Sequence, residues 1–287
     1  MEEYISDNSL YIRSKNNSMI NRKMIGRVLG MLLFIELGMF LLCAGVSAGY
    51  GESDYKYFLY TCIINAVVGG LLLLYGRGAE NKMSRRDGYC VVTLSWVFFT
   101  FFGMLPFYFS GSIDTITNAF FETMSGFTTT GATILDDIES LSHGMLFWRS
   151  LTQWIGGLGI VFFTIAILPI FTTGGVQLFS AESTGVTHDR THPKINVMAK
   201  WLWTIYLVLT VSETVLLMFG GMSLFDAICQ SFATTATGGY STKQNSISYW
   251  NSPYIEYVVA IFMIVSSINF SLFLMLSLIH IYEPTRH

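Results

Sequence analysis

Long apolar stretches alternate with short polar connectors along most of the chain. Six of these stretches reach the length of about 20 apolar residues that an α-helix needs to cross a bilayer. They cover residues 24–49, 57–76, 88–110, 148–172, 200–221 and 253–279. The pattern therefore predicts an all-α integral membrane protein with six spans.

Two shorter helical segments interrupt this series, one before the fourth span and one before the sixth. Residues 115–125 and 224–235 are each too short to cross a bilayer, and each runs into a turn rich in threonine and glycine. The turns read SGFTTTGAT at 125–133 and TTATGGYST at 234–242. Backbone that is neither helix nor sheet is tolerated at membrane depth only where it lines water or is buried in protein. The order of span, half-helix, turn and span is therefore typical of a re-entrant pore loop.

The pore-loop unit occurs twice. Gly239 of the second turn follows Gly131 of the first by 108 positions, and repeats of this size in transporters assemble around a shared axis. Two units supply half of a four-sided filter, so we expect either dimerisation or a longer parent protein. The chain is expected to begin with a cytoplasmic segment (1–23) and a two-helix hairpin (24–76). A first pore repeat (88–172), a cytoplasmic connector (173–199), a second pore repeat (200–279) and an atypical tail (280–287) follow.

Composition and charge agree with membrane insertion and orient the spans. Of the 287 residues, 52% are hydrophobic and 12% are charged, whereas a soluble domain has about 25% charged residues. Twelve lysines and arginines gather in the amino-terminal segment and in the connectors after the second and fourth spans. Because such residues stay on the cytoplasmic side, we expect the amino terminus inside and both turns outside. The four cysteines have no motif spacing, so no disulfide or metal framework is predicted.

Several segments carry a family resemblance. They are RRDGYCVVTLSWVFFTFFGMLPF at 85–107, FFETMSGFTTTGATIL, WRSLTQWIGGLGIVFFTIAILP, FDAICQSFATTATGGYST, and SSINFSLF at 266–273. Over roughly residues 20–275 the chain resembles the TrkH-type potassium uptake proteins of the Trk/Ktr/HKT cation transporter superfamily. That family folds four span–pore–span repeats into a potassium-channel-like pore, and its TrkH branch adds an amino-terminal pair of helices. Only the first two repeats are recognisable in this sequence, and its end, LIHIYEPTRH, is unlike the family, so we expect a fragment.

The resemblance implies potassium uptake across the cytoplasmic membrane of a bacterium or archaeon, by a channel or by symport. It implies no enzymatic activity, no organic cofactor and no nucleic-acid partner. The expected partners are a second copy of the chain, a cytosolic nucleotide-binding regulatory subunit of the TrkA kind, and membrane lipid. A sodium-permeable relative, a discontinuous-helix solute carrier and an inactive fragment stay open as alternatives. A glycine in both turns favours potassium over sodium.

By the same resemblance, the two turns form a selectivity filter. Its central glycines would be Gly131 and Gly239, and the surrounding backbone carbonyl oxygens would replace the water around a potassium ion. The expected filter residues and potassium ligands are Thr128, Thr129, Thr130, Gly131, Ala132, Thr237, Gly238, Gly239 and Tyr240. The alternative is a pair of ordinary external turns, which the duplication disfavours. Asn269 could face a water-filled cavity below the filter.

Four of the acidic residues within or beside the half-helices and spans have an expected structural role. A charge at membrane depth needs a partner or water. Glu122 is therefore expected to make a structural hydrogen bond behind the filter. Glu36 is expected to bond to another helix or to lie at an interface, and Glu213 to have a structural role. Asp226 is expected to cap the second half-helix.

Three further groups allow two interpretations each. The acidic residues after the first turn could form a cation-attracting vestibule or an ordinary solvated loop; they are Asp136, Asp137 and Glu139. Glycines of the fourth span could allow close helix packing, which is favoured, or a flexible gate; they are Gly156, Gly157 and Gly159. A docking surface is favoured over a metal site for the pair His188 and His192.

Overall fold

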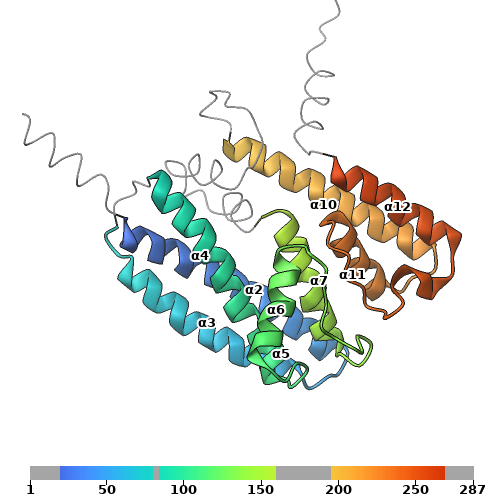
Figure 1. The fold of residues 1–287 in the computed structure, drawn as a ribbon, viewed down its shortest axis with the longest axis horizontal. Helices are drawn as coiled ribbons and strands as arrows, with labels where there is room; N and C mark the ends of the chain where they lie inside the picture. Colours follow the sequence, from blue (N-terminus) through green and yellow to red (C-terminus); the bar gives the residue numbers. More distant parts are fainter. Residues whose placement is uncertain (1–19, 80–83, 160–194, 269–287) are drawn as a thin grey trace, which may run out of the picture.

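All regular elements in the part of the chain that the structure describes are helices (Figure 1). The structure is a computed structural model, and it describes residues 20–79, 84–159 and 195–268. The first helices are α2 (Arg22–Gly49), α3 (Tyr55–Tyr75), α4 (Arg85–Gly103), α5 (Leu105–Phe109), α6 (Ile116–Phe127) and α7 (His143–Gly157). They are followed by α10 (Ile195–Phe219), α11 (Leu224–Thr235), the 3-10 helix η2 (Ser246–Trp250) and α12 (Pro253–Ser267). The prediction of an all-α protein is confirmed.

Four of the described helical segments are long and apolar enough to cross a membrane. They are Arg22–Gly49, Tyr55–Tyr75, Arg86–Phe109 and Trp201–Phe219. They correspond to the first, second, third and fifth predicted spans. The fourth and sixth spans begin with α7 and α12, and α7 starts at His143 rather than at 148. The rest of those two spans, most of the connector at 173–199 and the tail at 280–287 lie outside the described residues.

The third span, predicted over 88–110, is helical over Arg86–Phe109 with a one-residue interruption at Met104. α4 ends at Gly103, and the five-residue α5 follows it. Pro106 lies at the start of α5. Because proline has no N–H to donate and its ring collides with the preceding turn, the helix breaks just before the connector that leads to α6.

The hairpin of α2 and α3 is held together by glycines and by one buried polar pair. A Cβ added to Gly30 would lie 2.9 Å from the carbonyl oxygen of Gly69, so the two backbones touch at this point. Small residues allow membrane helices to approach this closely. The Asn65 amide donates a hydrogen bond of 3.1 Å to the buried Glu36 carboxyl. The prediction that Glu36 bonds between helices is confirmed.

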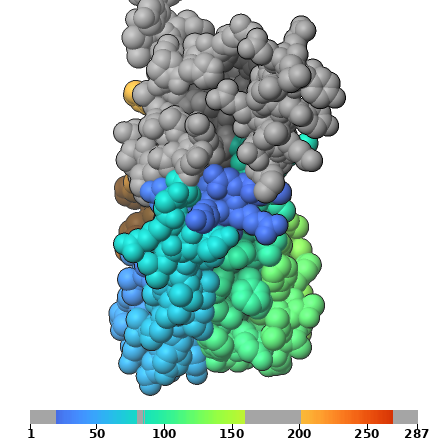
Figure 2. All heavy atoms as spheres, turned by 90° about the vertical axis from the view of Figure 1, so that its left-hand side faces the viewer, coloured from blue at the N-terminus to red at the C-terminus, as the bar shows by residue number. Residues whose placement is uncertain are grey.

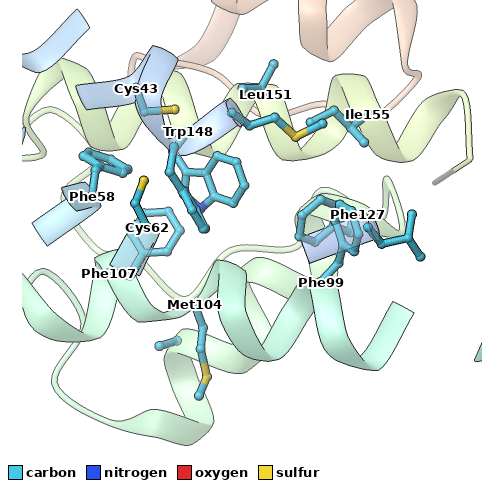
Figure 3. Packing of buried hydrophobic residues seen from close by; sticks show 14 of the residues in the cluster. Cys43, Phe58, Cys62, Phe99, Met104, Phe107, Phe127, Trp148, Leu151 and Ile155 are labelled. Carbon is cyan, nitrogen blue, oxygen red and sulfur yellow. The ribbon is translucent and has the colours of Figure 1, made fainter. Parts of the chain in front are cut away.

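The main hydrophobic core surrounds Trp148 of α7 (Figure 3). The indole ring lies 4.6 Å from the ring of Phe40 on α2 and 6.0 Å from that of Phe127 on α6, measured between centroids. Its N–H donates to the carbonyl oxygen of Gly103 at the end of α4, at 2.8 Å. Trp148 therefore fixes α6 against the hairpin and against α4.

The second repeat is a separate group of helices beside α7. α10, α11 and α12 pack on one another, and α11 also packs on α7 (orange to red in Figure 1). Their smaller core consists of Leu217, Met222, Ala227, Ile255, Val258 and Val259. The hairpin lies on the other side of the first repeat, and Figure 2 shows hairpin and first-repeat residues side by side on one face. α7 is thus the element that joins the two repeats.

Candidate functional site

The two half-helices have the same length and the same position within their repeats. α6 and α11 each contain 12 residues, and every boundary of α11 lies 108 positions after that of α6. Each begins with a hydroxyl cap: the side chain of Thr115 accepts from the Asn118 N–H, and that of Ser223 accepts from the Asp226 N–H. The prediction for the second half-helix, 224–235, matches the observed residues. The prediction for the first half-helix ended at 125, whereas α6 ends at Phe127.

Asp226 is not the cap of α11, contrary to the prediction. It is the third residue of the helix, and its carboxyl accepts hydrogen bonds from the hydroxyls of Ser223 at 2.8 Å and Thr242 at 2.6 Å. A carboxylate in the first turn suits the positive end of the helix dipole. Through Thr242, Asp226 ties the start of α11 to the chain that leaves the second turn.

The first turn leaves α6 through a left-handed threonine. Thr129 has φ of 51°, which is unusual for a β-branched residue. Its N–H donates to the Gly126 carbonyl at 3.0 Å, and the Thr130 N–H donates to the Ser125 carbonyl at 2.9 Å. This pair of bonds is the Schellman arrangement that ends many helices.

The second turn repeats this geometry. Thr237 has φ of 54° and donates to the Thr234 carbonyl, and Gly238 donates to the Ala233 carbonyl. Two residues after each left-handed threonine comes a left-handed glycine, Gly131 with φ of 76° or Gly239 with φ of 85°. Glycine adopts this conformation without the steric cost of a Cβ. The threonine and the glycine thus occupy equivalent backbone conformations in the two turns.

The two turns are in direct contact. A Cβ added to Gly131 would overlap the carbonyl oxygen of Gly238, so the glycine permits the close approach. At Gly239 an added Cβ would meet nothing within 4 Å among the described residues. The structure therefore brings the predicted filter residues of both repeats together, while Asn269 lies outside the described residues.

A buried arginine lies behind both turns. The Arg149 Nε of α7 donates to the Glu122 carboxyl of α6 at 2.8 Å, and its Nη1 donates to the Ser241 carbonyl at 2.9 Å. Its guanidinium carbon also lies 3.6 Å from the ring centroid of Tyr240. The ion pair is almost inaccessible to solvent, with side-chain exposures of 3% for Arg149 and 0% for Glu122. A charge pair at this depth is tolerated because each partner satisfies the other.

Glu122 also holds the first turn. Its carboxyl accepts from the Thr133 hydroxyl at 2.9 Å and from the Ile134 N–H at 3.0 Å. The prediction of a structural role behind the turn is therefore confirmed, and Arg149 is its unpredicted partner.

Two further side chains complete the support of the second turn. The fully buried Gln153, one helical turn after Arg149, accepts from the Tyr240 N–H at 3.0 Å. The Tyr240 hydroxyl donates to the Glu122 carbonyl at 2.8 Å and lies 3.3 Å from the Ala132 carbonyl. Tyr240 thus points its side chain away from the exposed side of the turn and into the first repeat.

Two glycines of α7 allow the helix to lie directly on the turns. A Cβ on Gly156 would overlap the carbonyl oxygen of Phe127 at the end of α6. A Cβ on Gly157 would lie 2.7 Å from the Cα of Ala236 at the end of α11. The prediction of close packing holds at Gly156 and Gly157.

The outer connectors are joined by polar contacts. The Ile138 N–H donates to the Gln244 side chain at 3.1 Å, and Glu139 lies 3.8 Å from Lys243. Asp137 accepts the N–H of Glu139 at 3.1 Å within its own loop. These contacts favour a structured solvated loop over a free acidic vestibule.

Sequence reasoning missed Arg149 and Gln153. Arg149 lies at the start of the apolar span predicted over 148–172, where a basic residue is easily taken for a flanking charge. The rule that an intramembrane charge needs a partner points to Glu122, the acidic residue within the half-helix of the same repeat. Gln153 follows Arg149 by four positions and therefore shares its helix face. That spacing was the available signal for Gln153.

Comparison with known proteins gives a consistent result. The family described as "TrkH: Cation transport protein" matches residues 55–285. The Trk system potassium uptake protein TrkH of Escherichia coli strain K12 is 42% identical over 250 residues, which are 86% of this chain and 52% of that protein. The Trk system potassium uptake protein TrkG of the same strain is 32% identical over 252 residues, 87% of this chain and 52% of that protein.

A solved structure agrees with these relatives. The crystal structure of the potassium transporter TrkH from Vibrio parahaemolyticus matches with a TM-score of 0.74 and 35% identity. The match covers 88% of this chain and 51% of that one. The chain thus spans about half the length of the relatives it matches.

Proposed function

Because this chain belongs to the TrkH family of cation transport proteins, we propose that its two turns form part of a potassium-selective filter through which potassium enters the cell. The filter residues are those of the two turns, 128–132 and 237–240. One observation carries the proposal: two turns of matching backbone conformation, each at the carboxyl end of a half-helix, touch each other at Gly131 and Gly238.

The hydrogen bonds of each turn direct carbonyl groups away from its half-helix. In a trans peptide, the C=O and the next N–H point in opposite directions. The N–H groups of Thr129 and Thr130 are bound to the end of α6, so the carbonyls of Thr128 and Thr129 face the other way. In the second turn the Gly238 N–H is bound to the end of α11, so the Thr237 carbonyl also faces away from its half-helix. Rings of such oxygens can replace the hydration shell of potassium.

The half-helices add to the attraction for a cation. The carboxyl end of a helix carries a partial negative charge, equivalent to roughly half an elementary charge. α6 and α11 both end at the turns. The membrane potential supplies the driving force, about 2.3 kcal/mol per charge for each 100 mV.

The same family membership supports the remaining proposals on assembly. The chain lies in the cytoplasmic membrane with its amino terminus inside, and apolar side chains on the outer side of α3 face lipid; they include Ile63, Val67 and Leu71. It works as a homodimer with a cytosolic nucleotide-binding subunit of the TrkA kind. The hairpin at 24–76 and the repeats at 88–172 and 200–279 are its structural parts.

The test is growth of potassium-transport-deficient cells that express the protein from its complete natural gene. Gly239→Asp places a carboxylate in the filter, at a position where an added Cβ meets no atom within 4 Å among the described residues. We expect it to abolish growth at low potassium. Gly111→Asp is the matched control, because Gly111 also has a left-handed φ of 72° and open space around it but lies outside the turns.

The amount of each variant in the membrane is measured by immunoblot. Growth of Gly239→Asp cells at the wild-type rate would remove the filter assignment. Preferential uptake of sodium over potassium by the wild-type protein would replace potassium by sodium as the transported ion.

A further inference from the structure

The second turn is anchored to α7 at two consecutive residues. Gln153 accepts the Tyr240 N–H, and Arg149 donates to the Ser241 carbonyl. Both side chains come from one face of α7 and are buried to at least nine-tenths. Their position behind the filter, rather than in it, makes them candidates for positioning residues.

The bond to Gln153 determines where the Gly239 carbonyl points. That carbonyl belongs to the same peptide group as the Tyr240 N–H, so the two point in opposite directions. Because Gln153 holds the N–H toward α7, the Gly239 oxygen is directed away from α7 and toward the open side of the turn. Gln153 thereby orients an oxygen of the central filter glycine.

The bonds of Tyr240 and Arg149 close a ring that includes both turns. Arg149 is bound to Glu122 of the first repeat and to the chain of the second. The Tyr240 hydroxyl returns from the second turn to the Glu122 carbonyl and lies close to the Ala132 carbonyl. The Ser125 hydroxyl also donates to the Ala132 carbonyl, at 2.6 Å. The separation of the two turns is thus fixed by hydrogen bonds rather than by packing alone.

This ring is not repeated around the second half-helix. The counterpart of Glu122 at an offset of 108 is Gln230, which is neutral and donates to Thr234 within its own helix. The counterpart of Tyr240 is Ala132. α12, which follows the second turn as α7 follows the first, contains no arginine, lysine or glutamine over Pro253–Ser267. The ring is therefore specific to the contact between the two turns.

We propose that Gln153, Arg149 and Tyr240 determine the preference for potassium over sodium by fixing the Gly239 carbonyl and the separation of the two turns. The proposal rests on the filter function proposed above. Sodium is smaller than potassium, so its coordination needs carbonyl oxygens that move closer together. A turn that is held at Tyr240 and Ser241 resists this movement, and a turn released from α7 does not.

The experiment compares two small substitutions with two matched controls. Gln153→Met removes the acceptor for the Tyr240 N–H at nearly constant side-chain length, and Tyr240→Phe removes only the hydroxyl. Gln244→Met is the control for the first, because Gln244 also accepts a backbone N–H but lies in the outer connector. Tyr249→Phe is the control for the second, because its ring is about half exposed in η2. All are expressed from the complete natural gene and reconstituted in vesicles.

The measured quantity is the ratio of sodium to potassium permeability. We expect the ratio to rise about fivefold in Gln153→Met and in Tyr240→Phe, the equivalent of one buried hydrogen bond, and to stay at the wild-type value in both controls. An unchanged ratio in Tyr240→Phe, recovered from the membrane at the wild-type level, overturns the proposal. If Gln153→Met fails to fold, the permeability ratio of Tyr240→Phe alone tests the proposal. Absence of potassium flux in the wild-type protein would instead refute the proposed function.

Discussion

The two turns share one backbone and have different supports. Thr129 and Thr237 are both left-handed, and each is followed by a left-handed glycine two residues later. Behind the first turn lies Glu122, in an ion pair with Arg149; at the same position behind the second lies the neutral Gln230. The local sequence determines the shape of each turn, whereas side chains of α7 determine how the two turns meet.

The largest expected effect follows from breaking the buried ion pair. Arg149→Met leaves the Glu122 carboxyl buried and uncompensated, so we expect a loss of about 3–5 kcal/mol in stability. Lys243→Met, which breaks the more exposed contact with Glu139, should cost at most about 1 kcal/mol. Denaturant unfolding of the purified protein in detergent measures both.

The double variant Arg149→Met with Glu122→Met should be more stable than Arg149→Met alone, because no charge then remains unpaired. Equal stability losses for Arg149→Met and Lys243→Met would contradict the buried pair.

The next prediction uses the glycines that the two turns share. Gly131→Ala and Gly239→Ala both force a side chain into a left-handed conformation, at about 1 kcal/mol each. Only at Gly131 does the new Cβ overlap the Gly238 carbonyl, which adds about 1–3 kcal/mol of overpacking. Gly131→Ala should therefore be clearly the less stable variant in the same unfolding measurement. The opposite order would mean that the turns do not touch.

A smaller effect tests the equivalence of the half-helices. Thr115→Ala and Ser223→Ala each remove the cap of one half-helix, and each should cost about 1 kcal/mol. Denaturation midpoints that fall by similar amounts support equivalent helix starts. A negligible effect at either position would show that its hydroxyl is not a cap.

The smallest effect is a pH dependence at the outer end of α7. Burial alone would raise the pKa of Glu52, but hydrogen bonds from His143 and the Gly144 N–H, together with the charge of protonated His143, lower it below its ordinary value of 4.5. The folded state is then favoured above that value, and this contribution is lost as the pH falls through the lowered pKa.

Because the pair is partly exposed, with side-chain exposures of 23% for Glu52 and 42% for His143, solvent screens it and the contribution is limited to roughly a few tenths of a kcal/mol. Thermal unfolding between neutral and acidic pH measures it. Glu52→Gln should unfold with a smaller dependence on pH than the wild type below 4.5. An identical pH profile in the two proteins would contradict the assignment.

Much of the fold followed from periodicity and local chemistry. Apolar length predicted the spans, and helix signals followed by threonine and glycine predicted α11 at its observed bounds. The family and the all-α fold were also predicted correctly. The interruption at Met104 was not predicted because the apolar pattern continues across it, although Pro106 gives the signal.

The tertiary contacts behind the turns could not be predicted in the same way. Arg149 contacts Ser241, 92 positions later, and no local pattern indicates such a pairing. Asp226 was interpreted as a cap because its type suits that position, but Ser223 lies at the boundary where the helix starts. Only the folded arrangement shows that Gln153 lies beside Gly238.

The most direct test of the filter is to locate the ion itself. Crystals of the protein, expressed from its complete natural gene and soaked in rubidium or thallium salts as heavy substitutes for potassium, are measured by anomalous diffraction. The account predicts anomalous peaks on the carbonyl side of the two turns, beside Gly131 and Gly239. Peaks found only elsewhere, with none beside these glycines, would contradict it.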